Sequence, residues 1–433
     1  MQGIALPPLE KRLKSRYLKL VQAHMHSATE LASGVASLPS VAKAFAATQA
    51  AWRFLNNERV TPAALAEPLR QVGRDRLAEA QAPFALLIHD WSKLGFTASQ
   101  RDLTRVTHGK DLGYDLTTAL LVSGDNGSPL APMEMHLKTA GGVLSTRPRA
   151  PKHVKHLDQV LPTMKASRTW GLSKPMVHVI DREADSVDHY RRWDADGHRF
   201  LVRGNARRVT WEGEARLLTE IREILRSRRV FGLIGEVPYH DTKAELWVAE
   251  TSVILDRPAW KTVKGKKRRK LAGRPLTLRL IIVQLRDDGG GVVAEWVLLS
   301  NVPQAWATTE RLAFCYYWRW RIESFFKLLK SHGQQLEHWQ QETGPAIFRR
   351  LLVAAMACVV VWRLQADRSP EAEELREILV RLSGRQTKRK RPHTAPALLA
   401  GLWVLLSMLA LLNHCDLDRL RNLASRVTYS GIG

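Results

Sequence analysis

Three acidic residues have the types and spacing of a divalent-metal site. Asp90 follows the apolar residues 84–88, and Asp181 follows a second, mostly apolar run, residues 176–180. Both runs are typical of buried strands, and acids at the carboxyl ends of neighbouring strands meet at one edge of a sheet. Clustered carboxylates repel one another unless a cation neutralises them. Because a single Asp at a strand end is more often a turn residue, the metal hypothesis needs a third carboxylate.

Glu323 would be this third carboxylate, on a single helix that we predict over residues 316–330. Four apolar residues at spacings of four, three and four should face a core: Trp318, Ile322, Phe325 and Leu329. The opposite face, within an arc of about 60°, carries Tyr316, Arg319, Glu323 and Lys330. Thr308 upstream is a suitable N-cap and Gly333 a suitable stop.

The polar face of this helix has two interpretations. It is a solvated surface with intrahelical ion pairs, which is the ordinary outcome, or it follows a nucleic-acid strand. A rise of about 1.5 Å per residue separates Tyr316 from Lys330 by about 21 Å, so the two cannot serve one phosphate. In the second interpretation Glu323 holds a metal at the reacting phosphate, and the other three side chains grip phosphates on either side.

Together these residues resemble a known catalytic signature. The acidic run at residues 181–185, the spacing from Tyr316 to Lys330 and the upstream Asp90 are similar to the signature of the IS4 family of DDE transposases, of the Tn5 type. Residues 52–57 and 296–302 also resemble this family. The likeness covers most of the chain.

The resemblance implies a DNA transposase with a metal-dependent active site. Asp90, Asp181 and Glu323 would be the catalytic residues and would bind two Mg²⁺ ions, with Mn²⁺ as an alternative, because oxygen ligands suit both. The enzyme would cut the terminal inverted repeats of its element through a hairpin intermediate and join them to target DNA as a homodimer. The residues assigned to DNA contact are Tyr316, Arg319, Lys330, Trp296, Arg182, Lys327, Arg203 and Lys43.

Trp296 stands at the start of a predicted strand, where a tryptophan is ordinarily a core residue. The resemblance gives it a different role, which is to accept a base that leaves the stack during hairpin formation.

The charge of the chain indicates a polyanionic partner. Its 66 Lys and Arg against 42 Asp and Glu give a formal net charge of +24, which suits nucleic acid and predicts salt-sensitive binding. An anionic membrane would also suit this charge, but the apolar residues 397–412 are short for a span of about 20 residues, and we expect a buried helix there. Cys315, Cys358 and Cys415 form no zinc-type pair, and residues 1–8 lack the apolar core of a signal peptide. These features favour a cytoplasmic protein without a membrane contact.

The order of the expected elements favours an α/β chain in three parts. Residues 76–372 read as strand, hairpin, helix, strand, helix and strand, a ribonuclease H-like order, with a β-rich insertion at about 206–303. Residues 1–75 and residues 373–433 are each predicted to form a helical domain. The resemblance implies that the first binds DNA ends and that the second makes a dimer contact. The basic run at residues 264–270 is either a solvated loop or a phosphate contact.

Two other functions are compatible with these residues. A different ribonuclease H-like nuclease would share the carboxylates without the specificity for element ends. A repressor derived from a transposase would need only the basic helical module. The net charge alone also permits a membrane-associated protein.

Overall fold

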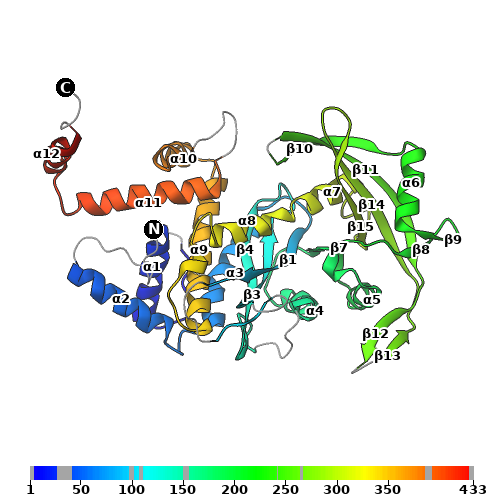
Figure 1. The fold of residues 1–433 in the computed structure, drawn as a ribbon, viewed down its shortest axis with the longest axis horizontal. Coiled ribbons are helices and arrows are strands. Elements are labelled where there is room, and N and C mark those ends of the chain that lie inside the picture. The colour runs from blue at the N-terminus through cyan, green and yellow to red at the C-terminus, as the bar shows by residue number, and fades with distance from the viewer. Residues whose placement is uncertain are drawn as a thin grey trace.

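The structure is a computed structural model that describes residues 4–26, 41–96, 102–106, 111–149, 156–240, 242–263, 267–385 and 393–428. It is a mixed α/β protein in which one large sheet has a group of helices on one side and continues into a mostly β region on the other (Figure 1).

Three helices open the chain: α1 (Lys11–His26), α2 (Val41–Leu55) and α3 (Pro62–Glu79). The hydroxyl of Thr61 accepts a hydrogen bond from the Ala64 N–H, and Pro62 occupies the first position of α3. The helical start agrees with the sequence prediction. The expected domain boundary after residue 75 lies within α3, however. This helix packs on strand β4 and on helix α9.

The sheet is built around β1, the strand that carries Asp90. It pairs antiparallel with β3 and parallel with β6, and the full order is β5-β4-β3-β1-β6-β7-β15-β14-β11-β8-β9, with β2 on β3 and β10 on β11. The first seven strands are β1 (Ala85–Leu94), β2 (Thr104–Arg105), β3 (Leu112–Val122), β4 (Pro129–Thr139), β5 (Gly142–Ser145), β6 (Met176–Ile180) and β7 (Arg199–Arg203). Between them lie α4 (His156–Ser167), η1 (Arg182–Ala184) and α5 (Val187–Ala195). The predicted strands and the hairpin of β3 and β4 are confirmed.

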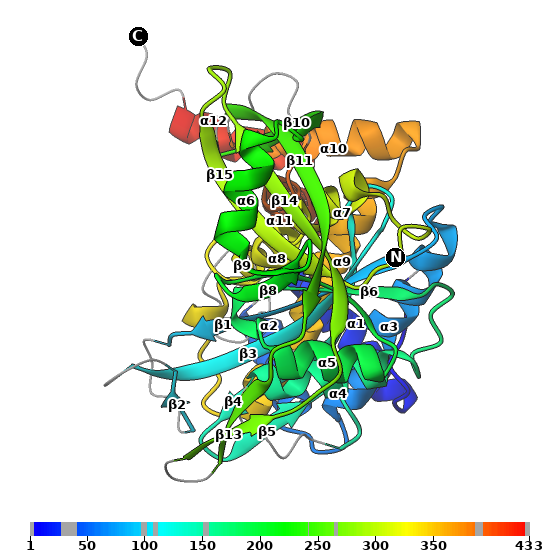
Figure 2. The same ribbon diagram turned by 90° about the vertical axis from the view of Figure 1, so that its right-hand side faces the viewer.

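A β-rich segment follows β7, as predicted. It contains β8 (Arg208–Trp211), β9 (Glu214–Leu217), α6 (Leu218–Ser227), β10 (Gly232–Tyr239), β11 (Thr242–Leu255), β14 (Leu276–Arg286) and β15 (Val292–Ser300). β15 pairs with β7, so the segment extends the central sheet. Figure 2 shows the result of the accumulated twist, since β11 and β14 run steeply across the view while β3 lies nearly horizontal.

The described part of the basic run, residues 267–270, lies on a two-stranded hairpin that projects from this segment in Figure 1. Its strands are β12 (Ala259–Val263) and β13 (Lys267–Leu271), and residues 264–266 between them lie outside the described residues.

Helices close the chain: α7 (Thr309–Tyr317), α8 (Trp320–Leu329), η2 (Leu336–His338), α9 (Gly344–Ala366), α10 (Pro370–Leu382), α11 (Ala395–Leu412) and α12 (Leu417–Thr428). Among the described residues, α9 and α11 are long and apolar enough to cross a membrane. The apolar window of α9 is 89% buried inside the protein, as expected of a core helix.

The expectation of a buried helix at residues 397–412 is wrong for most of α11, whose apolar window is 28% buried. Its first half packs on α10, α1 and α9, but its second half extends beyond these helices (Figure 1). Val404, Met408, Leu409 and Leu412 are therefore exposed.

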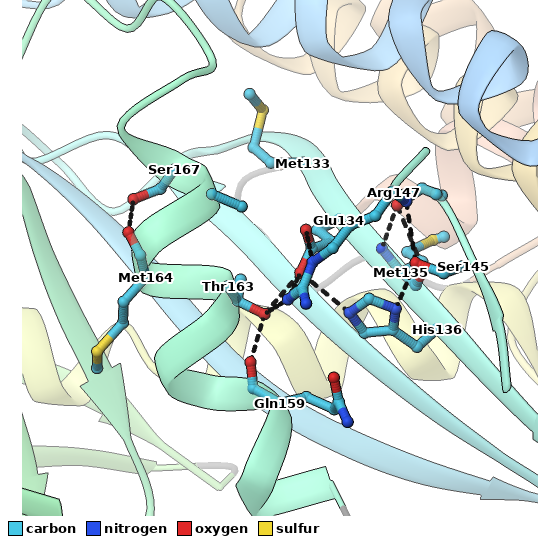
Figure 3. A network of polar contacts seen from close by, with 12 residues as sticks. Met133, Glu134, Met135, His136, Ser145, Arg147, Gln159, Thr163, Met164 and Ser167 are labelled. Atoms are coloured by element: carbon cyan, nitrogen blue, oxygen red, sulfur yellow. Dashed lines mark hydrogen bonds and ion pairs between the residues drawn. The ribbon is translucent and has the colours of Figure 1, made fainter. Parts of the chain in front are cut away.

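A buried ion pair fixes α4 on the sheet (Figure 3). Arg147 donates to both carboxylate oxygens of Glu134 on β4, at 2.7 and 2.6 Å, and the hydroxyl of Thr163 on α4 donates to the same carboxylate at 2.6 Å. Burial alone would raise the pKa of Glu134, but hydrogen bonds from His136 and Arg147 outweigh it and hold this pKa well below its usual range. The carboxylate of Glu134 thus joins β4 to α4 and to Arg147, which follows β5.

Candidate active site

Asp90 and Asp181 lie side by side where β6 ends. The prediction that Asp90 also ends its strand is wrong, because β1 pairs with β3 as far as Leu94. β1 and β6 are parallel, and His89 lies opposite Ile180. The residue that follows each of these two is an aspartate. Asp181 is the N-cap residue of η1. The side chain of Asp90 is 16% exposed and accepts a hydrogen bond from the N–H of Trp91 at 2.9 Å.

Glu323 lies on α8, which a short break separates from α7. The prediction of one helix over residues 316–330 is therefore wrong. In the break the N–H of Arg319 bonds to the carbonyl three residues back, the tighter 3₁₀ pattern. A tertiary contact accompanies it, since Gly127, at φ 71°, approaches Trp318 so closely that a Cβ would lie 2.2 Å from the indole ring. The predicted apolar stripe is buried: Trp318, Ile322, Phe325 and Leu329.

Arg319 joins two of the three carboxylates. Its Nη1 donates to Asp90 Oδ2 at 3.0 Å, and its Nη2 donates to Glu323 Oε1 at 2.7 Å. The Arg319 side chain is 8% exposed, and its Nε has no hydrogen-bond partner among the described residues. The guanidinium thus neutralises the carboxylates from within the protein, whereas the sequence analysis expected it to face a phosphate.

Tyr316 reaches the third carboxylate. Its hydroxyl donates to Asp181 Oδ1 at 3.1 Å. The pKa of Tyr316 is raised, mainly by burial and next by the charge of Asp181. The phenol therefore remains a proton donor at neutral pH. Trp296 is also buried, with its ring centroid 5.3 Å from that of Tyr316 and 5.6 Å from that of Trp320. Trp296 is therefore a packed neighbour of the site.

Lys330 also contacts protein groups. Its Nζ donates to the carbonyl of Lys93 on β1 at 2.8 Å and forms an ion pair with Glu337 at 3.0 Å. The end of α8 is thereby tied to the strand that carries Asp90.

The remaining predicted DNA contacts differ in position. Lys327 on α8 and Arg182 on η1 are exposed, and Arg203 is half-buried at the end of β7. Lys43 belongs to α2, far from the carboxylates along the chain, and its side chain lies outside the described residues.

The electrostatics of Asp90 reflect its crowded position. Burial raises its pKa to about 6, against the lowering effects of Arg319 and of the Trp91 N–H, and the carboxylates of Glu323 and Asp181 raise it further. One guanidinium therefore only partly compensates the negative charge of the cluster.

The side chains of Asp90, Asp181 and Glu323 suit a hard divalent cation, because all three are carboxylates and such ions prefer oxygen ligands. Among the described residues, no three His, Cys, Asp or Glu side chains lie close enough to hold an ion as they stand. The reason is visible at Arg319, which fills the space between Asp90 and Glu323 with its own positive charge. A metal would have to displace this guanidinium.

The sequence analysis missed one neighbour of the site, His156 at the start of α4. Its ring stacks on Trp91 with centroids 3.9 Å apart, and its nitrogens contact Asp115 at 3.5 Å and Glu183 at 3.3 Å. Of the residues around His156, the sequence motif included only Glu183, which belongs to the acidic run at residues 181–185. The other partners come from separate elements that only the fold brings together.

The fold and the site define an α/β protein with a carboxylate cluster at the edge of its central sheet. Residues 130–360, more than half of the chain, match the family described as the transposase DDE domain. The chain belongs to this family, whose members in general are metal-dependent polynucleotidyl transferases. The matched residues include Asp181 and Glu323, and Asp90 lies upstream of them.

No curated protein matches the chain. Among solved structures, a piggyBac transposase synaptic complex with hairpin DNA is similar at 9% sequence identity with a TM-score of 0.35, over 95% of this chain and 74% of that chain. A likeness at this level supports no statement about the present protein.

Proposed function

We propose that this protein is a DNA transposase of the IS4 family, of the Tn5 type, which cuts the ends of its own element and joins them to target DNA. The observation that supports this proposal is that Arg319 contacts both Asp90 and Glu323, with Asp181 on the neighbouring strand end, in a member of the DDE family. The net charge of +24 favours DNA as the partner.

The catalytic core is proposed to be ribonuclease H-like, within residues 76–372 and with the β-rich insertion at about 206–303. The strand order β3-β1-β6-β7, with β3 antiparallel and the others parallel, supports this reading. The helices before it would bind the element ends, and the helices after it would form a dimer contact.

Asp90, Asp181 and Glu323 would hold two Mg²⁺ ions, with Mn²⁺ as an alternative. When bound, such ions activate the attacking water or 3′ hydroxyl and stabilise the leaving oxygen. Within the chain, Tyr316 orients Asp181 by a neutral hydrogen bond. Arg319 would leave its two carboxylates and donate to a DNA phosphate, the role that its position in the signature suggests.

We further propose that cutting proceeds through a DNA hairpin and that Trp296 helps to accept the displaced base. Trp296→Phe keeps an aromatic ring in the packed cluster, and it should slow hairpin formation more than first-strand nicking. Both steps are followed on a denaturing gel, alongside the thermal stability of the variant. Equal loss of both steps at unchanged stability would count against this role.

The protein is proposed to act in the cytoplasm, as a homodimer in the complex with two element ends and without a membrane contact. The exposed apolar residues of α11 and α12 support a dimer contact, since they include Leu409, Leu412, Leu417 and Leu423.

The experiment that tests the function uses purified protein, Mg²⁺ and a labelled DNA fragment that carries the junction flanking its own gene. Wild-type protein should cut at the element boundary and give a hairpin-sized product. Glu323→Ala and added EDTA should each abolish the cut, because each removes the metal site. Glu374→Ala, which removes an exposed carboxylate on α10, should cut like the wild type.

Metal-dependent cutting without preference for the junction would replace the proposal with a different nuclease. Tight junction binding by a wild-type protein that never cuts would replace it with a repressor.

A further inference from the structure

A basic pocket lies at the edge of the sheet opposite to the carboxylates. Its volume is about 320 Å³, and it lies between the two loops that lead into β6 and β7. The lining residues that matter here are Arg168, Lys174, His178, His198, Arg199 and Trp306. No aspartate or glutamate is among the described residues that line it.

This pocket is separate from the candidate active site. β6 runs from Met176 beside the pocket to Ile180, and Asp181 follows at the other edge. At about 3.3 Å per residue, the two ends are about 17 Å apart. One phosphate cannot occupy both places.

The cations of the pocket donate to carbonyl groups, and the nearby carboxylates of Asp196 and Asp125 act on Arg168 and Lys174 only from beyond ion-pair distance. Lys174 donates to the carbonyls of Ala80 and Ala82, and Arg199 donates to the carbonyl of Asn301 at 3.5 Å. Within the described residues, neither they nor Arg168 form an ion pair with a carboxylate. The positive charge is therefore fixed in position and remains available to an anion.

Arg168 donates to the carbonyl of Asp196. The carboxylate of Asp196 is engaged elsewhere, since it pairs with Lys165 at 3.0 Å. The loop before β7 thus positions the guanidinium, and Asp196 offsets its charge only in part because the Asp196 carboxylate pairs with Lys165.

His198 supplies an unused hydrogen-bonding group. It is 4% exposed, and its Nε2 has no hydrogen-bond partner among the described residues. The pKa of His198 is lowered to about 4, mainly by burial and next by the charge of Arg168. The ring is therefore neutral at neutral pH and can donate one N–H. A buried polar atom without a partner is unfavourable, and an acceptor oxygen in the pocket would satisfy it.

Trp306 adds an aromatic surface. Its side chain is half-buried, and the guanidinium carbon of Arg199 lies 5.9 Å from its ring centroid. A ring in this position suits the sugar and base that accompany a DNA phosphate better than it suits a free inorganic ion.

We propose that this pocket binds a backbone phosphate of a second DNA segment, distinct from the strand held at the carboxylates. This inference rests on the proposed function and deepens it, because joining two DNA molecules requires the protein to hold DNA outside the cleavage site. A phosphodiester oxygen would accept from Arg168, Arg199 and His198 together.

The test compares wild-type protein with the double variant Arg168→Gln/Arg199→Gln. The charge-matched control is Arg192→Gln/Arg381→Gln, which removes two exposed arginines outside the pocket. Affinity for a labelled duplex of unrelated sequence is measured by fluorescence anisotropy in EDTA over a range of salt concentrations, after equal thermal stability of the three proteins is shown. The pocket variant should bind several-fold more weakly than the control, with a log–log salt slope shallower by about 1 to 2.

Identical affinity and slope in the two double variants would overturn the proposal. Inorganic phosphate at matched ionic strength serves as a second probe. If it stabilises the wild type but not the pocket variant, while DNA affinity is equal in both, the pocket takes a free anion and the proposal is wrong. Binding is measured without metal and without cutting, so its outcome is independent of the junction-cleavage test of the proposed function. In that cleavage test the pocket variant should still nick a bound end.

Discussion

Arg319 is the residue that links two of the three carboxylates of the candidate active site. It carries the only guanidinium that contacts both Asp90 and Glu323 among the described residues, and it occupies the space in which a metal would bring these two carboxylates together. The same positive charge that stabilises the three acids must therefore oppose metal binding.

Removing this charge should strengthen metal binding in the absence of DNA. We expect Arg319→Gln to bind Mn²⁺ about tenfold more tightly than the wild type, since a buried unit charge next to the ligands is lost. Titration calorimetry or the electron paramagnetic resonance signal of free Mn²⁺ measures this directly. Lys327→Gln, which removes an exposed cation from the same helix, is the control and should bind as the wild type does. Unchanged or weaker binding by Arg319→Gln would show that the guanidinium does not compete with the metal.

At the scale of elements, the active site depends on how helices are fixed against the sheet. α4 is tied to β4 through Thr163 and Glu134, and it presents His156 to Trp91, the residue after Asp90. α8 is tied to β1 through Lys330. The catalytic edge is thus supported from both of these helices.

Breaking the Glu134 network should destabilise the fold. Glu134→Gln leaves Arg147 buried without its counter-charge, and we expect a loss of about 3 to 5 kcal/mol in the free energy of unfolding, measured by denaturant titration. Glu212→Gln removes an exposed partner of Arg228 and should change stability little. A small effect at Glu134 would mean that α4 is held by its apolar contacts.

The same carboxylate makes a pH prediction. Because the pKa of Glu134 in the folded protein is held below its unfolded value of about 4.3, its stabilising contribution is complete above that value and is lost as the pH falls below it. The stability difference between the wild type and Glu134→Gln should therefore shrink on acidification below about pH 4. A difference that stays constant down to the acid transition would contradict the depressed pKa.

At the scale of the whole molecule, the second half of α11 is an apolar segment that the described residues leave exposed. It continues into α12, where Leu417 and Leu423 are also exposed. An apolar surface of this kind on a highly charged protein is typical of an interaction site.

We expect this surface to join two chains in the complex with DNA ends. Light scattering after size-exclusion chromatography should find two chains in the wild-type complex and one in Met408→Glu/Leu409→Glu. Val292→Glu/Val293→Glu alters exposed apolar residues of β15 and should leave two chains. Two chains in the α11 variant, or one in the wild type, would rule out this contact.

The sequence by itself determined those features that neighbouring residues encode. The buried strands that lead to Asp90 and Asp181, the hairpin of β3 and β4, the cap at Thr308 and the apolar stripe of residues 318–329 all follow from local periodicity and turn chemistry, although β1 continues past Asp90 to Leu94. The carboxylates could be proposed as a group because parallel strands end at a common edge.

The tertiary structure alone decided which side chains meet. Arg319 and Asp90 are 229 residues apart in sequence, and helical periodicity cannot tell whether a guanidinium faces solvent or a distant carboxylate. The break between α7 and α8, the burial of Trp296 and the exposed half of α11 likewise depend on contacts between separate elements. The basic pocket also depends on such contacts, since its cations come from two segments of the chain and its tryptophan from a third, and only the completed sheet brings them together.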